Sequence, residues 1–162
     1  MREVSVDAPE LRALMPEDAA IARAFVEQHH GDPRYEPRLL EMLDSVLRFE
    51  DPEYMALLAV DPASSELRGL ALFGTVAGAL RVVKLHAVLG SELVVLLALL
   101  DGVRRMAESS GERMIVCELP DETAFVLVAE SLGESEYLEE GRVPDFVRDG
   151  VALRLMVWRA GE

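Results

Sequence analysis

Residues 80–119, LRVVKLHAVLGSELVVLLALLDGVRRMAESSGERMIVCEL, contain a strand, a helix and a second strand in direct succession. The apolar pattern predicts strands at Leu80–Val88 and Arg113–Leu119. Between them a helix is expected over residues 91–109, ended by Gly111. One crossover helix between two strands of a sheet predicts parallel neighbours with right-handed topology. This segment decides the fold class, because it requires parallel strands and a helix packed on one face of the sheet.

The rest of the chain supplies further strands and helices around this segment. Pro16 and the acids after it suit the first turn of a helix, since proline is tolerated there and acids favour the positive end of the dipole. The spacing predicts an extended stretch through Val4, Val6 and Leu11–Leu14, helices from Pro16 to Gly31 and from about Pro37 to Phe49, strands Tyr54–Val60 and Leu67–Gly74, a helix from Asp121 to about Leu132, and strands Tyr137–Val143 and Val151–Trp158 joined by a loop over residues 144–150. This order predicts an α/β fold with one mixed, mostly antiparallel sheet and helices on both faces.

Length and composition indicate a single domain over residues 1–162. Apolar residues make up 51% of the chain, which is enough for a core and argues against disorder. The longest apolar run, Leu93–Leu100, falls well short of the roughly 20 residues that span a bilayer. The first residues have no apolar signal core, and the single cysteine, Cys117, excludes an internal disulfide. We therefore expect a cytoplasmic protein with no membrane partner.

The charge balance bears on the class of partner. The chain has 30 acidic and 16 basic residues, for a net charge of −14. A surface this acidic repels phosphate backbones, so we expect no nucleic-acid partner. The same charge favours cationic ligands such as amines, and it is equally the ordinary means of keeping a protein dispersed in solution.

The junction between the strand and the long helix, Leu89-Gly90-Ser91-Glu92, has the form of an anion site. The first turn of a helix has free backbone N–H groups, and the helix dipole adds positive charge there. Gly90 and Ser91 can offer two backbone N–H donors, with Ser91 as the expected helix cap. Glu92 would place a carboxylate beside a bound anion, which is unfavourable, although solvent and salt would screen it.

Three segments resemble the GNAT superfamily of acetyl-CoA-dependent N-acetyltransferases. Residues 11–19, LRALMPEDA, look like that family's first strand-to-helix junction, residues 67–72, LRGLAL, look like its I-x-G-x-x strand, and residues 141–151, GRVPDFVRDGV, look like its closing strand–loop–strand. The resemblance implies the GNAT fold, acetyl-CoA as co-substrate, and acetyl transfer to an amine of a small molecule or a protein. It also implies that Val88, Gly90 and Ser91 hold the pantetheine and pyrophosphate through backbone groups.

The chain departs from the GNAT pattern at the start of the long helix. Members usually carry a basic, glycine-rich loop there, and in this sequence Val94 and Leu96 stand where its two glycines belong. An alternative hypothesis is therefore a non-catalytic GNAT fold that has lost cofactor binding and serves as an interaction domain. Under that hypothesis the apolar run Val94–Leu100 is either core or a surface that buries against a partner subunit.

The chain also departs from the pattern in the last helix. Many members carry a tyrosine before the Gly-Phe that ends this helix, and that tyrosine protonates the departing thiolate. With Gly133 as the glycine, Ala129 or Val128 takes the place of the tyrosine and Glu134 replaces the phenylalanine.

The strand Leu80–Val88 supplies the first candidate catalytic residue. Lys84 and His86 share one face of it with Val88, and polar residues inside a central strand need an explanation. We expect them to line a cleft where this strand diverges from the next one, so that His86 can accept a proton from an ammonium substrate. The alternative is a structural His86, hydrogen-bonded in the core or at a dimer surface.

The second parallel strand supplies the other candidate base, Glu118, because α/β proteins often place sites at the C-terminal edge of the sheet. Its alternative role is that of a surface or ion-paired residue. Cys117 alternates to the opposite face and is expected to be a small buried side chain. His29 and His30 are adjacent at a helix end and lack the spacing that converges on one ion, so we expect no metal site. A homodimer is a further candidate partner.

Overall fold

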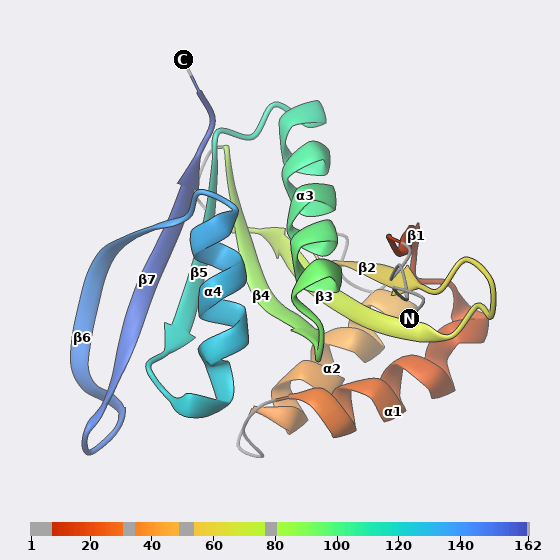
Figure 1. Cartoon of the computed structure of the whole chain (residues 1–162), viewed down its shortest axis with the longest axis horizontal. Helices are drawn as coiled ribbons and strands as arrows, with labels where there is room; N and C mark the ends of the chain where they lie inside the picture. Colours follow the sequence, from red (N-terminus) through yellow and green to blue (C-terminus); the bar gives the residue numbers. More distant parts are fainter. Residues whose placement is uncertain (1–7, 31–34, 49–53, 77–80, 162) are drawn as a thin grey trace, which may run out of the picture.

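The computed structural model describes residues 8–30, 35–48, 54–76 and 81–161. These residues form one seven-stranded sheet flanked by helices (Figure 1). The strands are β1 (Glu10–Ala13), β2 (Tyr54–Val60), β3 (Leu67–Thr75), β4 (Val82–Gly90), β5 (Met114–Pro120), β6 (Leu138–Arg148) and β7 (Val151–Arg159). The helices are the short η1 (Pro16–Asp18) and η2 (Thr123–Phe125), and α1 (Ala19–His29), α2 (Glu36–Leu47), α3 (Leu93–Ser109) and α4 (Val126–Glu134).

The strand order across the sheet is β1-β2-β3-β4-β5-β7-β6. β4 and β5 are parallel neighbours, and the other adjacent pairs are antiparallel. α3 connects β4 to β5, as expected for a crossover between parallel strands. The predicted fold class, a mixed and mostly antiparallel sheet with helices on both faces, is confirmed.

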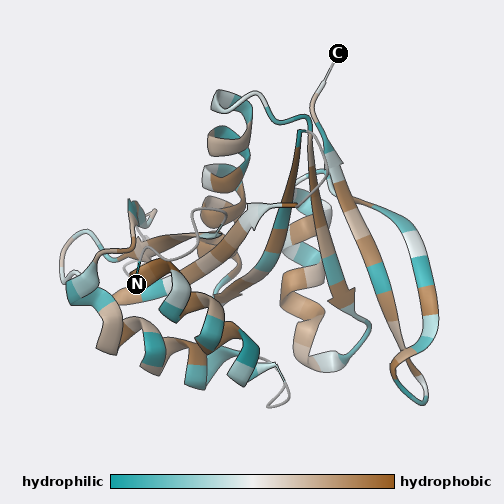
Figure 2. Cartoon of the chain, turned by 180° about the vertical axis from the view of Figure 1, so that it is seen from behind, coloured by the Kyte–Doolittle hydropathy of each residue, from teal (hydrophilic) through white to brown (hydrophobic). Residues whose placement is uncertain are grey.

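Two hydrophobic clusters lie on opposite faces of the sheet. One joins α1 and α2 to β2, β3 and β4, and its members Val26, Leu43 and Leu70 are completely buried. The other joins α3 and α4 to β3, β4, β5 and β7, around the buried side chains of Leu99 and Ile115. The central strands are therefore hydrophobic on both faces, whereas the outer strands alternate (Figure 2).

The apolar run at the start of α3 is core. Val95, Leu96, Leu99 and Leu100 are buried, because α3 packs on the sheet with one side and on α4 with another. Val94 is the exposed member, with 39% of its surface accessible. Of the two roles considered for this run, burial within the domain is the observed one.

β4 contains a bulge that sequence periodicity did not predict. Leu72 of β3 pairs with Ala87, while Phe73 pairs with Leu85, so His86 is the extra residue. The bulge moves Val88 into the cluster on the α3 face, together with Leu85. The expectation that Val88 shares a face with Lys84 and His86 is therefore wrong, because strict alternation fails at a bulge.

Two other differences concern the bounds of elements. α3 begins at Leu93 with Glu92 as its N-cap, so the predicted cap at Ser91 is wrong. β6 continues to Arg148, which leaves a tight turn through Gly150 instead of the longer loop predicted over residues 144–150. The expected structure at Val4, Val6, Gly31, Phe49 and Leu80 lies outside the described residues. In the part of the chain that the structure describes, no helix is long and apolar enough to cross a membrane.

Candidate functional site

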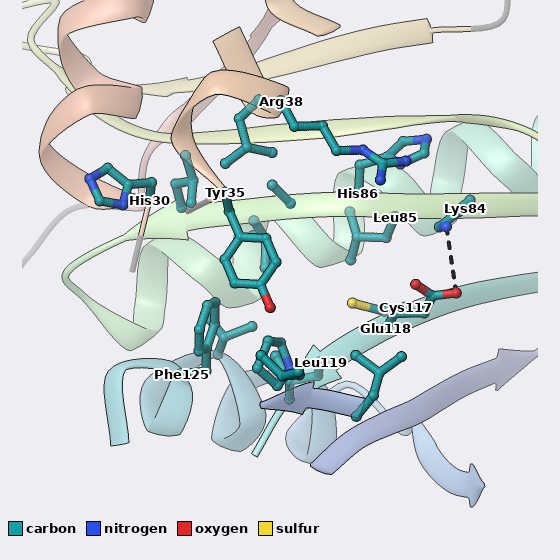
Figure 3. A pocket seen from close by; sticks show the side chains of 18 of the residues that line it. His30, Tyr35, Arg38, Lys84, Leu85, His86, Cys117, Glu118, Leu119 and Phe125 are labelled. Carbon is teal, nitrogen blue, oxygen red and sulfur yellow. Dashed lines mark ion pairs between the residues drawn. The ribbon is translucent and has the colours of Figure 1, made fainter. Parts of the chain in front are cut away.

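The site begins where β4 and β5 separate. Their pairing runs from Val82 and Met114 to Lys84 and Val116 and then ends, although both strands continue. Among the described strands, β4 pairs beyond this point only with β3, and β5 only with β7. The divergence opens a cavity of about 320 Å³ (Figure 3). Its walls come from β4 and β5, from one face of α2, from Phe125 and the start of α4, and from the β6–β7 tip.

One wall of the cleft is a face of α2 and the residue before it. Tyr35, Arg38, Leu39 and Met42 follow the i, i+3, i+4, i+7 spacing of one helix face, and all four line the cleft. The ring of Tyr35 meets Phe125 edge-on, with centroids 6.1 Å apart and planes at 84°. The two rings thus connect the α2 side of the cleft with the start of α4 (Figure 3).

His86 lines the cleft as a neutral imidazole. Burial lowers its pKa to about 4, assisted by the charges of Lys84 and Arg38 and opposed by Glu118. Its ring stacks edge-on against Tyr54 of β2, at a centroid distance of 5.4 Å. Its Nε2 atom is buried without a hydrogen-bond partner among the described residues. A buried nitrogen without a partner is available to a bound molecule.

The other candidate base, Glu118, is brought to the same cleft but is already paired. Its carboxylate lies 3.6 Å from Nζ of Lys84 across the gap between the two strands (Figure 3). Its side chain remains 49% exposed. The structure therefore places both predicted bases, His86 and Glu118, in one cavity with Lys84, and Glu118 is in an ion pair.

Sequence reasoning missed Arg38, which reaches the cleft from α2. Figure 3 shows its guanidinium extending toward the imidazole of His86, in agreement with its effect on the pKa of that residue. Arg38 forms no ion pair or hydrogen bond with any described residue. In the sequence, Arg38 is a cation on the same helix face as Tyr35, Leu39 and Met42. Its role could be recognised only once the position of the cleft was known.

The three residues expected to hold the cofactor lie along the end of β4 and the turn after it. Val88 lines the cleft, Gly90 ends the strand in a half-buried position, and Ser91 is exposed. The first hydrogen bonds of α3 run from the N–H groups of Val95 and Leu96 to Glu92, which leaves the two preceding N–H groups without an acceptor in the helix.

The carboxylate of Glu92 is not an isolated charge at this turn. An Nη atom of Arg68 in β3 lies 3.2 Å from its Oε2 atom, and the Nε atom of Arg68 lies 3.4 Å from Oε1. The guanidinium of Arg68 thus offsets the negative charge of Glu92, which the sequence indicated to be unfavourable beside a bound anion. Sequence reasoning missed Arg68, because it lies 24 residues away on another strand.

Two other groups considered from the sequence have structural roles. Cys117 is buried, and burial raises the pKa of its thiol to about 12, so it is not a thiolate at neutral pH. His29 stacks on Phe25 at 4.0 Å, and its Nδ1 lies 3.1 Å from the carbonyl oxygen of that residue. Among the described residues, no cluster of three or more His, Cys, Asp or Glu side chains could hold a metal ion.

Comparison with known proteins identifies the fold. No protein-family model and no curated protein gives a significant sequence match. Among solved structures, one assigned to the GNAT family of acetyltransferases, from Desulfovibrio desulfuricans, aligns with a TM-score of 0.79 at 18% identity and covers 94% of this chain and 99% of its own. The chain has the GNAT acetyltransferase fold.

Other solved structures with the GNAT fold agree with this assignment. The aminoglycoside 6′-N-acetyltransferase from Enterococcus faecium has a TM-score of 0.73 at 14% identity, over 93% of this chain and 96% of its own. A protein from Salmonella typhimurium, solved with its cofactor acetyl-CoA, has a TM-score of 0.71 at 15% identity, over 96% of both chains. The resemblance stated from the sequence is thus confirmed at the level of fold.

Proposed function

We propose that this protein transfers the acetyl group of acetyl-CoA to an amine, using the cleft between β4 and β5. The observation that carries the proposal is the neutral imidazole of His86, which has no hydrogen-bond partner for Nε2 among the described residues and lies inside a cleft that opens where the parallel strands of a GNAT fold diverge. Structural neighbours described as acetyltransferases support the same class of reaction. The acceptor is an amine of a small molecule or of a protein.

The residues at the end of β4 fit acetyl-CoA in two respects. Beyond Lys84, no described strand pairs with β4 on the β5 side, so the backbone of this edge can pair with the amide groups of an extended pantetheine. The open N-terminus of α3 offers N–H donors to a pyrophosphate, with Glu92 offset by Arg68. Val88, Gly90 and Ser91 would hold the molecule, which supplies a thioester carbonyl for attack.

His86 is proposed to accept the proton that the attacking ammonium must lose. Its low pKa keeps the imidazole unprotonated at neutral pH, so Nε2 can receive a hydrogen bond from the substrate nitrogen. Glu118 is the second candidate base, and it lines the same cavity in an ion pair with Lys84. Most of the acceleration would come from holding the two reactants together, which needs few dedicated groups.

The test begins with binding and continues to turnover. Calorimetry with coenzyme A and acetyl-CoA measures cofactor affinity, and release of the coenzyme A thiol in the presence of amines measures transfer. His86→Ala should lower turnover by about 10²–10⁴. The matched control His29→Ala alters a histidine that does not line the cleft and should leave turnover unchanged.

The outcomes separate the proposal from its rival. Turnover that depends on His86 supports acetyl transfer. Absence of binding to both forms of the cofactor contradicts it and favours a GNAT fold that has become an interaction domain. The observation that supports this alternative hypothesis is the presence of Val94 and Leu96 where the glycines of the family's loop usually stand.

A further inference from the structure

The cleft differs in charge from the rest of the protein. The whole chain has a net charge of −14, yet among the described residues that line the cleft the side chains with a permanent charge are Arg38, Lys84 and Glu118, and His30 lies beside Glu36. Lys84 and Glu118 offset each other at 3.6 Å. With His86 neutral and Lys84 paired, the guanidinium of Arg38 is the permanent cation of the cleft that no described residue pairs with.

We propose that the amine acceptor also carries a carboxylate, and that Arg38 binds this carboxylate at the α2 side of the cleft. A guanidinium presents its donors in a planar fork that matches a carboxylate, which makes it a specific partner and not only a point charge. One unpaired cation matches one carboxylate, whereas a doubly charged phosphate would leave excess negative charge. The proposal names the substrate class of the acetyl transfer proposed above and rests on it.

The position of Arg38 separates the acceptor from the cofactor. Arg38 approaches from α2, beside Lys84 and His86 (Figure 3), whereas Val88 belongs to the face of β4 that packs under α3. The walls of the cleft include residues of α2 on one face of the sheet and of α4 on the other, so the two reactants can contact it from different layers. Leu39 and Met42 line the cleft next to Arg38 and give the hydrocarbon part of the acceptor an apolar contact.

Binding of a carboxylate at Arg38 has a consequence for His86. The groups that face its imidazole are Lys84 on its own strand, Glu118 on β5, Arg38 on α2 and the ring of Tyr54 on β2. Arg38 and Lys84 both lower the pKa of His86, so a carboxylate that neutralises Arg38 removes one of these effects. The bound acceptor would therefore make the imidazole a stronger base.

The test uses the protein without cofactor and needs no turnover. Leucine, methionine and 6-aminohexanoate are each compared with their carboxamides, so that the members of a pair differ in the carboxylate alone. Binding is followed through the NMR signals of the His86 imidazole, which also report its pKa. The variants are Arg38→Gln, Arg38→Lys and the control Arg105→Gln, which makes the same charge change at a 65% exposed side chain on α3.

In at least one pair the carboxylate should bind about tenfold or more tightly than the carboxamide. That preference should disappear in Arg38→Gln, return in part in Arg38→Lys, and persist in Arg105→Gln. The pKa of His86 should rise from about 4 when the carboxylate binds. Equal binding of acid and amide in every pair would overturn the proposal, as would a preference that survives in Arg38→Gln.

An acetylation assay on the same compounds distinguishes failure of this inference from failure of the proposed function. Carboxylate-selective binding without transfer to any amine would leave the Arg38 site standing and refute acetyl transfer. Equal transfer to acids and amides would refute the role of Arg38 and leave acetyl transfer standing.

Discussion

Replacing Gly69 by alanine should destabilise the protein, because α3 packs directly on the backbone of β3 at this residue. A Cβ atom built on Gly69 would lie 2.5 Å from Cγ1 of Val95, 2.8 Å from Cδ1 of Leu99 and 3.1 Å from the carbonyl oxygen of Leu89. Valine in a helix strongly prefers one rotamer, so Cγ1 of Val95 cannot readily turn away. The new methyl group would therefore push α3 away from the sheet.

Two opposing effects set the size of this change. Forcing an extra methyl group into a packed core costs about 1–3 kcal/mol. Alanine also has less conformational entropy than glycine in the unfolded chain, and this offsets about 0.4–1 kcal/mol of that cost. The net loss in the free energy of unfolding is about 1–2 kcal/mol, which corresponds to a fall in Tm of roughly 2–8 °C for a domain of this size.

Urea unfolding followed by circular dichroism measures this loss, with two controls. Gly133→Ala, in α4, adds a methyl group that meets nothing within 4 Å and should leave stability unchanged or raise it by up to about 1 kcal/mol. In a Val95→Ala background the closest contact is gone, so Gly69→Ala should cost less than in the unmodified protein. If Gly69→Ala is as stable as the unmodified protein, or lowers the free energy of unfolding equally in both backgrounds, this account of the packing is refuted.

Three further predictions concern charge. Glu92→Gln should strengthen coenzyme A binding about two- to fivefold in calorimetry at low salt, with the gain shrinking as salt rises, because it removes a negative charge and releases the contact with Arg68. Asp18→Asn should cost about 1–3 kcal/mol in urea unfolding, because the buried carboxylate accepts bonds from Arg12 at 2.6 and 2.7 Å. The bond with Arg12 lowers the pKa of Asp18. The contribution of the Asp18 carboxylate to the free energy of unfolding is therefore fully present above the usual carboxyl pKa and is lost as the pH falls through the lowered pKa. Between pH 6.5 and about pH 4 the unfolded chain binds a proton at His86 that the folded protein does not, so the free energy of unfolding falls as the pH falls through this range. In His86→Gln this part of the pH dependence should be absent, a difference on the order of 1 kcal/mol after allowance for solvent screening.

The fold could be predicted because its signals are local. Continuous apolar strands and a long apolar helix predicted the β4–α3–β5 unit and its parallel pairing, and the structure confirms both. Gly69 shows that the resemblance at residues 67–72 also has a physical basis, since only a residue without a side chain lets α3 approach β3 this closely. Apart from the bulge in β4, errors were confined to boundaries, such as the cap of α3 and the length of β6, where alternation and capping patterns are weakest.

The candidate site could be predicted only in part, because its geometry depends on contacts distant in sequence. Polarity within a central strand was enough to select Lys84 and His86. The bulge that turns Val88 to the other face arises from pairing with β3, and no local pattern encodes it. Arg38 and Arg68 reach the site from α2 and β3, so their roles appear only when the sheet is assembled.

The contrast between the acidic surface and the cationic cleft favours one kind of acceptor. A net charge of −14 raises the local concentration of cations and so favours the approach of an ammonium group. Inside the cleft, Arg38 offers a guanidinium that no described residue pairs with, which favours a carboxylate. A simple amine satisfies only the first condition, and a simple acid satisfies only the second. A zwitterion, with its ammonium group directed to His86 and its carboxylate to Arg38, satisfies both. Under the proposed function, it would deliver the charge that makes His86 a better base only when the substrate is in place.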